Sequence, residues 1–534
     1  MKNTFFYIIL LVVNSISFSQ EIGTGKDVAV TSTESGKVKG YIHNSIYTYK
    51  GIPYAEAKRF EAAKKPKSWQ GVRSSTSYGP VAPLLIPTTQ IDDESEFVFD
   101  HDWGFSNEDC LRINIWTPGI NDTIKRPVLF WIHGGGYTAG SSQELPTYDG
   151  ENLSKRGDVV VVSINHRLNV LGYLNLSAYS DKYKHSANNS ILDLVSALEW
   201  VKTNISNFGG DPNNVTIFGQ SGGGAKVNTL MAMPKAKGLF HKAINQSGSF
   251  SNNFLTKEDT QSIAAEVLNI LGITAVQVDS LQTIPFETLS RVSSMALENM
   301  TQKWKKEGKF SESFRANWAP SIDNSDIPYQ VNSTKSLELS KNIPLLIGST
   351  KNEFTPFMNM QFNDASEEVV KNHIKNIYGD KAESYITAVK KAYPNDTKPS
   401  DLLTIDTLFR AGAIEQANSK SNLLDGAPVY LYLFTWQSPV FDGKYKSLHC
   451  MEIPFVFDNL EHGKNMIGGS KEAQPLADYM SNAWINFARN GNPNPKNNSD
   501  WPAYTSKNTL TMYFDTISIV KPQQDKELLE LLTN

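Results

Sequence analysis

The chain has 534 residues, of which 40% are hydrophobic, and its 51 basic and 55 acidic side chains give a formal net charge of −4. This mild acidity gives no electrostatic reason to expect nucleic-acid binding or attachment to an anionic membrane. Only two cysteines are present, and a chain of this length can build its core without disulfide bonds.

Residues 1–19 have the features of a secretory signal peptide. Lys2 precedes an apolar stretch from Phe5 to Val13, and small polar residues follow it up to Ser19. The stretch is too short for a good membrane span, and no later apolar run is long enough for one. We therefore expect a secreted or periplasmic protein without stable membrane insertion, whose mature chain covers residues 20–534.

Residues 128–132 form an apolar run that predicts a strand buried on both faces of a parallel sheet. His133 and the glycines Gly134, Gly135 and Gly136 follow it, where backbone N–H groups can approach a substrate oxygen closely. The spacing fits neither a Walker loop nor a dinucleotide-binding fingerprint. We interpret the segment as half of an oxyanion hole, in which His133 holds the loop.

A serine lies between a second predicted strand and a helix-compatible segment, residues 225–233. The motif is Gly-Gln-Ser-Gly-Gly, residues 219–223, and it follows a β-branched and aromatic run. This context is typical of a nucleophile elbow, because a sharp turn exposes the hydroxyl of Ser221 and leaves no room for neighbouring side chains. The N–H group of Gly222 can then face a developing oxyanion. Glycine-rich turns that contain serine are common, so the motif alone is weak evidence for a catalytic serine. An acid and a base must also be found in the sequence.

An acyl-transfer serine requires a base, and the base requires a carboxylate that orients it. Residues 343–348 predict a strand, and the loop after it carries Glu353. Residues 429–434 predict another strand, beyond which His449 begins an apolar run. This order of serine, acid and histidine is that of α/β-hydrolases. Glu452 is an alternative acid, and spacing alone favours Glu353 only moderately.

The remaining histidines are not expected to act as the base. Two adjoin apolar segments and are expected to be structural, namely His166 and His241. Five lie in polar surroundings and are expected at the surface, namely His43, His101, His185, His373 and His462.

Longer motifs carry a family resemblance. Residues 108–116 read Glu-Asp-Cys-Leu-Arg-Ile-Asn-Ile-Trp, residues 208–212 read Phe-Gly-Gly-Asp-Pro, and residues 484–493 read Trp-Ile-Asn-Phe-Ala-Arg-Asn-Gly-Asn-Pro. Over nearly the whole mature chain these motifs and the elbow resemble the type-B carboxylesterase/lipase family, which includes bacterial para-nitrobenzyl-type esterases and the cholinesterases. The resemblance implies an α/β-hydrolase fold, with a central, mostly parallel sheet flanked by helices. Residues 252–340 have helix-like segments and few strands, which predicts a cap region within a single domain.

The resemblance also implies roles for particular residues. Ser221 matches the nucleophile, Glu353 the acid and His449 the base. The N–H groups of Gly135, Gly136 and Gly222 match the family's oxyanion donors. The resemblance implies no metal or cofactor.

The chain departs from the family pattern at several positions. Gln220 stands where Glu is usual, which removes a negative charge and implies less preference for cationic substrates than in the cholinesterases. Phe354 stands where Gly is usual, and Gly222 stands where Ala is often found. Cys110 has no cysteine before it to pair with, and a bridge to Cys450 is conceivable but not favoured.

These features predict a serine carboxylesterase that acts through an acyl-enzyme on a small-molecule ester. Gln220, Phe354 and Trp318 are candidate substrate-binding residues, although Trp318 is at least as well explained as an ordinary buried aromatic. The alternatives are a true lipase on long-chain esters and a non-catalytic adhesion or binding member of the same fold. The natural ester and the oligomeric state do not follow from the sequence.

Overall fold

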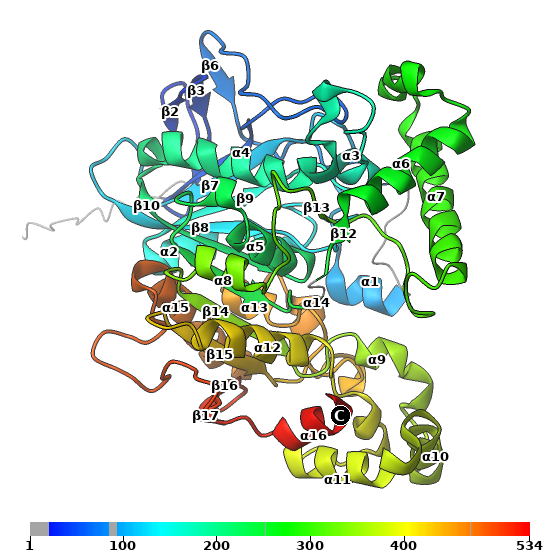
Figure 1. Cartoon of the computed structure of the whole chain (residues 1–534). Helices are drawn as coiled ribbons and strands as arrows, with labels where there is room; N and C mark the ends of the chain where they lie inside the picture. The colour runs from blue at the N-terminus through cyan, green and yellow to red at the C-terminus, as the bar shows by residue number, and fades with distance from the viewer. Residues whose placement is uncertain (1–20, 85–92, 251–252, 470, 534) are drawn as a thin grey trace, which may run out of the picture.

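A large mixed β-sheet forms the centre of the computed structural model, which describes residues 21–84, 93–250, 253–469 and 471–533 (Figure 1). The predicted signal peptide lies outside these residues. The twelve strands of the sheet are, in spatial order, β1 (Ile22–Gly23), β4 (Tyr41–His43), β5 (Ile46–Pro53), β7 (Arg112–Thr117), β9 (Val160–Ile164), β8 (Arg126–Ile132), β10 (Gly210–Gln220), β11 (Lys242–Gln246), β14 (Leu345–Thr350), β15 (Val429–Phe434), β16 (Leu510–Phe514) and β17 (Ile519–Pro522).

The middle of the sheet is parallel and its edges are antiparallel. All pairs from β9 to β16 in the spatial order are parallel, whereas β1, β4, β5 and β7 on one side and β17 on the other pair antiparallel. The carboxyl ends of the parallel strands meet at one edge, where open α/β sheets bind their ligands. The predicted α/β-hydrolase architecture is confirmed.

Helices cover both faces of the sheet because its central strands are apolar on both sides. Every residue of β8 is buried. Val128, Phe130 and Ile132 belong to one hydrophobic cluster, which includes side chains of α4, α5 and α12. Leu129 and Trp131 belong to a second cluster on the opposite face, with side chains of α2, α13 and α15. The period of two in a strand produces this alternation.

The helices connect these strands or extend beyond the sheet (Figure 1). Their bounds are α1 (Asp93–Phe99), α2 (Glu151–Gly157), α3 (Asn169–Tyr173), α4 (Asn189–Asn204), α5 (Gly222–Met231), α6 (Lys257–Leu271), α7 (Phe286–Lys306), α8 (Thr334–Leu339), α9 (Thr355–Met358), α10 (Glu367–Tyr378), α11 (Ala382–Ala392), α12 (Phe409–Ser421), α13 (Ile453–Val456), α14 (Lys464–Ile467), α15 (Gln474–Asn490) and α16 (Lys526–Thr533).

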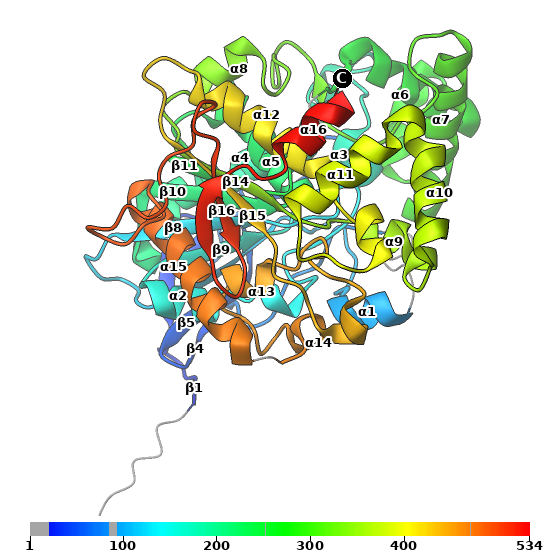
Figure 2. The ribbon, with the colours of Figure 1, turned by 90° about the horizontal axis from the view of Figure 1, so that it is seen from below.

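Two small sheets accompany the large one. β2 (Val30–Thr33), β3 (Gly36–Lys39) and β6 (Val72–Ser74) form the first, and β12 (Leu255–Thr256) and β13 (Ser321–Ile322) form the second. β12 and β13 lie in the predicted cap segment, whose long helices α6 and α7 pack against each other. Seen from below, β1 and α16 lie far apart on the molecule, with α16 against α11 (Figure 2).

The predicted strands all occur, residues 429–434 with the predicted bounds and the others with shifted ends. β14 continues through Ser349 and Thr350, which the sequence analysis assigns to the following loop. α5 begins at Gly222, directly after the serine. Among the described residues no single helix is both long and apolar enough to cross a membrane, although the bent pair of Lys257–Leu271 and Ala275–Gln282 passes a test of length and composition.

Candidate active site

The serine of the elbow lies at the junction of β10 and α5 in a strained conformation. Ser221 has φ of 56° and ψ of −125°, a combination that a non-glycine residue rarely adopts. A side chain on Gly223 would meet the strand β8, since its Cβ would lie 2.8 Å from the carbonyl carbon of Ile132. Glycine is therefore required for the close crossing of helix and strand, and the turn holds the Ser221 side chain at the end of the sheet.

Backbone amides converge beside this serine. Gly136 has φ of 61°, and a Cβ on Gly222 would lie 2.5 Å from the backbone nitrogen of Gly136. The two residues are thus in direct backbone contact, which only glycine allows at Gly222. Among the described residues, the N–H groups of Gly135 and Gly136 have no hydrogen-bond acceptor. Unpaired N–H groups in this turn, beside the start of α5 at Gly222, are suited to an oxyanion.

Glu353 and His449 form a buried pair. Nδ1 of His449 is hydrogen-bonded to Oε2 of Glu353, and the backbone N–H of His449 donates to the carbonyl oxygen of Glu353 at 3.1 Å. The other carboxylate oxygen accepts from Oγ of Ser247 at 2.7 Å and from the backbone N–H of Thr350 at 2.8 Å. Glu353 has no exposed surface and His449 is 3% exposed. Nδ1 therefore carries a proton toward the carboxylate, which leaves Nε2 as the basic atom.

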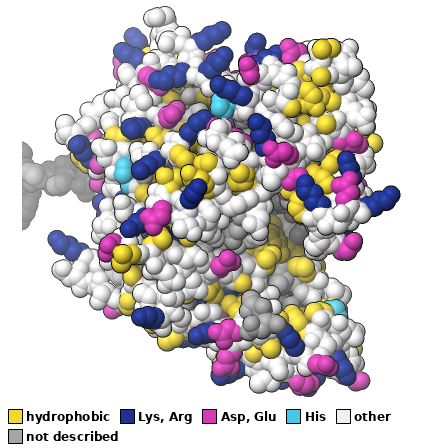
Figure 3. Space-filling view, in the orientation of Figure 1, with side chains coloured by type: hydrophobic (Ala, Val, Ile, Leu, Met, Phe, Trp, Pro, Cys, Tyr) yellow, Lys and Arg dark blue, Asp and Glu magenta, His cyan; other side chains and the backbone are white. Residues whose placement is uncertain are grey.

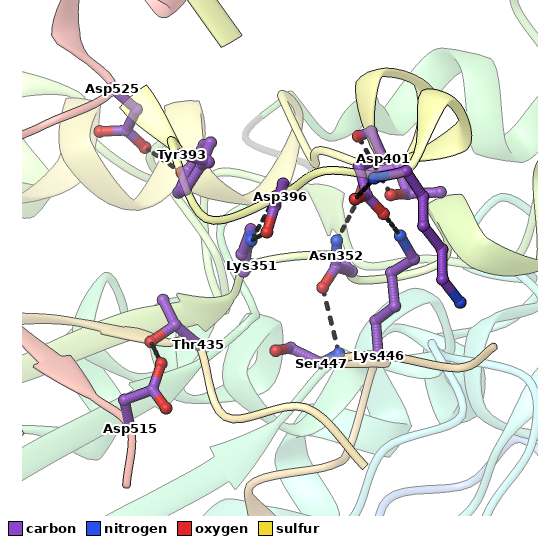
Figure 4. Close-up of polar contacts among 12 residues, drawn as sticks. Lys351, Asn352, Tyr393, Asp396, Asp401, Thr435, Lys446, Ser447, Asp515 and Asp525 are labelled. Atoms are coloured by element: carbon purple, nitrogen blue, oxygen red, sulfur yellow. Dashed lines mark hydrogen bonds and ion pairs between the residues drawn. The ribbon is translucent and has the colours of Figure 1, made fainter. Parts of the chain in front are cut away.

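The loops that carry this pair are tied together by Asn352 (Figure 4). Its Oδ1 accepts from the backbone N–H of Ser447 at 3.1 Å, and its Nδ2 donates to the carbonyl oxygen of Thr404 at 2.6 Å. Lys351 forms an ion pair with Asp396 at 2.6 Å on the same side. These contacts connect three segments that are distant in sequence and fix the separation of Glu353 and His449.

The alternative acid, Glu452, does not contact the histidine ring. Its Oε1 accepts from Nε2 of Gln246 at 3.0 Å. Burial raises the pKa of Glu452 to about 7, with a further contribution from the charge of Glu353, and burial likewise raises the pKa of Glu144 to about 7. Glu353, which is hydrogen-bonded to Nδ1 of His449, is therefore the carboxylate that contacts the ring.

His449 also contacts two of the residues singled out as departures from the family pattern. The ring of Phe354 stacks on its imidazole, with centroids 4.1 Å apart and an angle of 32° between the rings. Nε2 of Gln220 lies 3.1 Å from Nε2 of His449. Among the described contacts, no hydrogen bond joins Oγ of Ser221 to His449. Such a bond is often absent before substrate binds and forms in the reacting complex.

A cavity of about 380 Å³ opens beside Ser221. Four aromatic side chains from three separate segments form part of its wall, namely Phe99 at the end of α1, Tyr148 before α2, and Phe354 and Phe357 at the start of α9 and within it. In Figure 3 hydrophobic side chains gather around α1, where the surface is hollowed between α7 and α9. The cavity also contains Gln220 and His449, so reactive and apolar groups share one space.

Three expectations about this region need correction. Trp318 does not line the cavity, since it is 8% exposed and packs in the hydrophobic core of the first cluster. None of the described residues of the predicted cap segment lines the cavity either, and α1 and α9 take that place. His101 is not at the surface, because its side chain is 3% exposed, stacks on Phe99 and Trp103, and lines the cavity.

The sequence reasoning missed several lining residues, among them Phe99, His101, Tyr148 and Phe357. They lie in loops, a short turn or helices of seven residues or fewer, which are too short to show a periodic pattern, so only their aromatic character was a signal. His133 packs away from the cavity, where Nδ1–H donates to the carbonyl oxygen of Gly134 at 3.0 Å, and burial keeps its pKa well below the usual value. Both cysteines are free thiols, and Cys450 lines the cavity.

Comparison with known proteins identifies the family of this chain. The sequence profile of the Carboxylesterase family matches residues 27–528. The chain belongs to this family. It is 34% identical over 513 residues to the para-nitrobenzyl esterase of Bacillus subtilis, covering 93% of this chain and 97% of that one. It is 32% identical over 490 residues to the phenmedipham hydrolase of Pseudarthrobacter oxydans, with 89% and 92% covered.

Solved structures agree in fold as well as in sequence. An esterase from Clostridium hathewayi has a TM-score of 0.84 and 36% identity, covering 95% of this chain and 98% of that one. A thermophilic para-nitrobenzyl esterase has a TM-score of 0.74 and 34% identity, with 94% and 99% covered. This carboxylesterase-family chain is a carboxylic ester hydrolase. Within its described residues, no group of three or more His, Cys, Asp or Glu side chains could hold a metal ion.

Proposed function

We propose that the enzyme hydrolyses carboxylic esters through a triad of Ser221, His449 and Glu353 and a covalent acyl-enzyme. One observation carries this proposal: a strained serine, a buried histidine–carboxylate pair and unpaired backbone N–H groups all border the same cavity. Each group is of the type that acyl transfer to a serine requires.

In the first half of the reaction, Nε2 of His449 accepts the proton of Ser221 as the oxygen attacks the ester carbonyl carbon. The N–H groups of Gly135, Gly136 and Gly222 bind the negative oxygen of the tetrahedral intermediate. His449 then donates the proton to the leaving alcohol, and the acyl group stays on Ser221. Glu353 holds the ring in the tautomer with Nδ1–H and stabilises the imidazolium.

In the second half, His449 takes a proton from a water molecule that attacks the acyl carbon. The intermediate collapses, Ser221 leaves with the proton from the histidine, and the carboxylic acid is released. Water supplies the only additional atoms, so the triad returns to its starting state.

The cavity favours esters with an aromatic group. Phe99, Tyr148, Phe354 and Phe357 offer flat apolar surfaces within about 380 Å³, enough for one ring and a short acyl chain. Among the relatives, one is named para-nitrobenzyl esterase, and the Clostridium enzyme is described as hydrolysing aliphatic aromatic polyesters. A true lipase would instead show a rise in activity when a long-chain substrate passes its solubility limit.

We also propose that the enzyme is secreted to the periplasm or the exterior, on the basis of the charged and apolar pattern of residues 1–19. Expression of the full chain, followed by fractionation and N-terminal sequencing, tests this. Cleavage near residue 19 in the exported fraction is the expected result, and an uncleaved chain in the cytoplasm would contradict it.

The triad is tested by replacing its nucleophile. Ser221→Ala should abolish hydrolysis of para-nitrophenyl acetate and covalent labelling by a fluorophosphonate, since it removes the oxygen that forms the acyl-enzyme. Ser262→Ala, on α6 outside the cavity, is the matched control and should keep both. Retention of labelling by the Ser221 variant would refute the assignment.

A further inference from the structure

The side chain of Gln220 lies over the face of the His449 ring. Its amide nitrogen is 3.1 Å from Nε2 and 3.5 Å from Nδ1 of the imidazole. An in-plane hydrogen bond to Nε2 would leave the amide nitrogen much farther from Nδ1 than from Nε2. The similar distances therefore place the amide above the ring, away from the in-plane lone pair of Nε2.

Phe354 occupies the other face of the same ring. Its centroid lies 4.1 Å from that of the imidazole, and the two rings are inclined by only 32°. A phenyl ring and an amide at these separations would overlap if they shared one face. The imidazole is thus held between the two side chains, which fixes the plane of the ring while Glu353 fixes one of its edges.

Cys450 determines which end of the amide faces the ring. Its Sγ donates to Oε1 of Gln220 at 3.2 Å, and Gln220 has no exposed surface. A thiol is a weak donor and a weaker acceptor, so it favours the carbonyl end of the amide. The NH₂ end, which carries partial positive charge, is thereby directed at His449.

The direction of this dipole affects the charge state of the ring. An N–H group above a neutral imidazole meets the electron-rich face of an aromatic system, which is favourable. Above an imidazolium the same group meets a positive charge, which is unfavourable. A carboxylate in this place would have the opposite effect, because an opposite charge within about 4–6 Å favours the charged form.

We propose that Gln220 is a positioning residue, which together with Phe354 clamps the plane of the His449 ring and, through the N–H end of its amide, opposes protonation of that ring. The inference rests on the proposed role of His449 as the base. It predicts that the enzyme keeps its neutral, active histidine at lower pH than a variant with a carboxylate at position 220. It also predicts faster return of the proton to the leaving alcohol, since the imidazolium is less stable.

Other titratable groups face the same region and are unchanged in the variants at position 220. They are Glu353 after β14, Asp406 before α12, Glu452 before α13, Cys450 beside it, Glu144 after β8 and Lys226 in α5. Because these groups are constant, a difference between variants at position 220 reports on the side chain that was changed.

The first experiment measures kcat/KM for para-nitrophenyl acetate against pH in the wild type, Gln220→Met and Gln220→Glu. Methionine keeps the length without the dipole, and glutamate reverses the charge. The pH of half-maximal activity on the acid side should rise in the order Gln, Met, Glu, by about one unit in total. Gln437→Glu is the control for added charge, since residue 437 is exposed and away from the cavity, and its profile should equal that of the wild type.

The second experiment measures the rate of fluorophosphonate labelling of Ser221 against pH, which needs the base but no product release. Cys450→Ala should raise the half-maximal pH, because the amide loses the donor that orients it, whereas Cys450→Ser should keep the wild-type value. The two Cys450 variants also test the role of the Gln220 amide if a variant at position 220 fails to fold.

The results separate the two proposals. A wild type that is not labelled at Ser221 would refute the triad itself. A labelled wild type whose half-maximal pH equals that of folded Gln220→Met and Gln220→Glu would overturn the role of Gln220, as would a shift to lower pH in Gln220→Glu. Equal values for Cys450→Ala and Cys450→Ser would overturn the part assigned to the thiol.

Discussion

Lys226 is a buried cation whose removal should stabilise the enzyme. It lies in α5 with no exposed surface, and its Nζ donates to the carbonyl oxygen of His133 at 3.4 Å. In the part of the chain that the structure describes, no carboxylate lies within ion-pair distance of it. Burial lowers its pKa from 10.5 to about 7, although the charge of Glu144 opposes the shift. Lys226→Met keeps the length and apolar character of the stem and removes the charge.

The gain in folding stability from Lys226→Met depends on pH, because the folded and unfolded chains bind the proton of Lys226 with different affinity. Between pH 7 and 10.5 the unfolded chain protonates Lys226 and the folded chain does not, so folding stability rises with pH in this window. At pH 6 both states are charged, and the shift of 10.5 − 7 = 3.5 units corresponds to about 5 kcal/mol of destabilisation. At pH 9 about 2 kcal/mol remains. The lost hydrogen bond to His133 subtracts about 1 kcal/mol from each gain.

Thermal unfolding of the wild type and Lys226→Met at the two pH values measures this difference. An unfolding entropy of about 2.1 cal/mol/K per residue gives about 1.1 kcal/mol/K for 534 residues, so 4 kcal/mol raises Tm by about 4 °C. The expected gain is about 4 °C at pH 6 and about 1 °C at pH 9.

A second buried lysine provides the control. Lys351 is 5% exposed but is paired with Asp396 at 2.6 Å. Lys351→Met leaves that carboxylate without its partner and should lower Tm at both pH values. Equal or lower stability of Lys226→Met at pH 6, or a larger gain at pH 9 than at pH 6, would refute the reasoning.

Two further predictions concern the groups around the serine. Ser247→Ala removes the donor 2.7 Å from Oε1 of Glu353, a hydrogen bond to a charged group worth about 1.5–3 kcal/mol, so kcat/KM should fall about 10- to 100-fold; unchanged hydrolysis of para-nitrophenyl acetate would contradict this. Gly222→Ala places a methyl group against Gly136 and should lower kcat by about 10²–10³ through loss of oxyanion binding. Circular dichroism must first show that this variant is folded, and a folded variant with wild-type kcat would contradict the close contact of Gly222 and Gly136 on which this prediction rests.

Much of the fold could be predicted because its signals are local. The run of residues 128–132 is apolar at every position, which in a parallel sheet means burial on both faces, and β8 is buried throughout. The glycines around Ser221 reflect a turn in which a Cβ at Gly223 would clash with β8, so the motif itself contains the geometric requirement. Such features can be recognised in the sequence because they depend on short-range sterics and on the periodicity of a strand.

The partners of the serine were less certain in the sequence because they depend on contacts between distant loops. Glu353 and Glu452 are both acidic and both near predicted strands, so spacing favours Glu353 only moderately. The family resemblance favours Glu353, and in the structure the hydrogen bond to Nδ1 distinguishes it from Glu452. That bond depends on Asn352, whose side chain joins the loops before Glu353 and His449. Spacing along the chain cannot specify such a contact.

What the sequence determined by itself was the family, the parallel sheet and the elbow at Ser221, since each rests on neighbours within a few residues. Only the tertiary structure decided the walls of the cavity. It excluded Trp318, brought in His101 and placed Gln220 over the imidazole ring. The physical reason is that a side chain lines a cavity or the core according to which distant segments pack around it, and irregular segments carry no periodic pattern that records those neighbours.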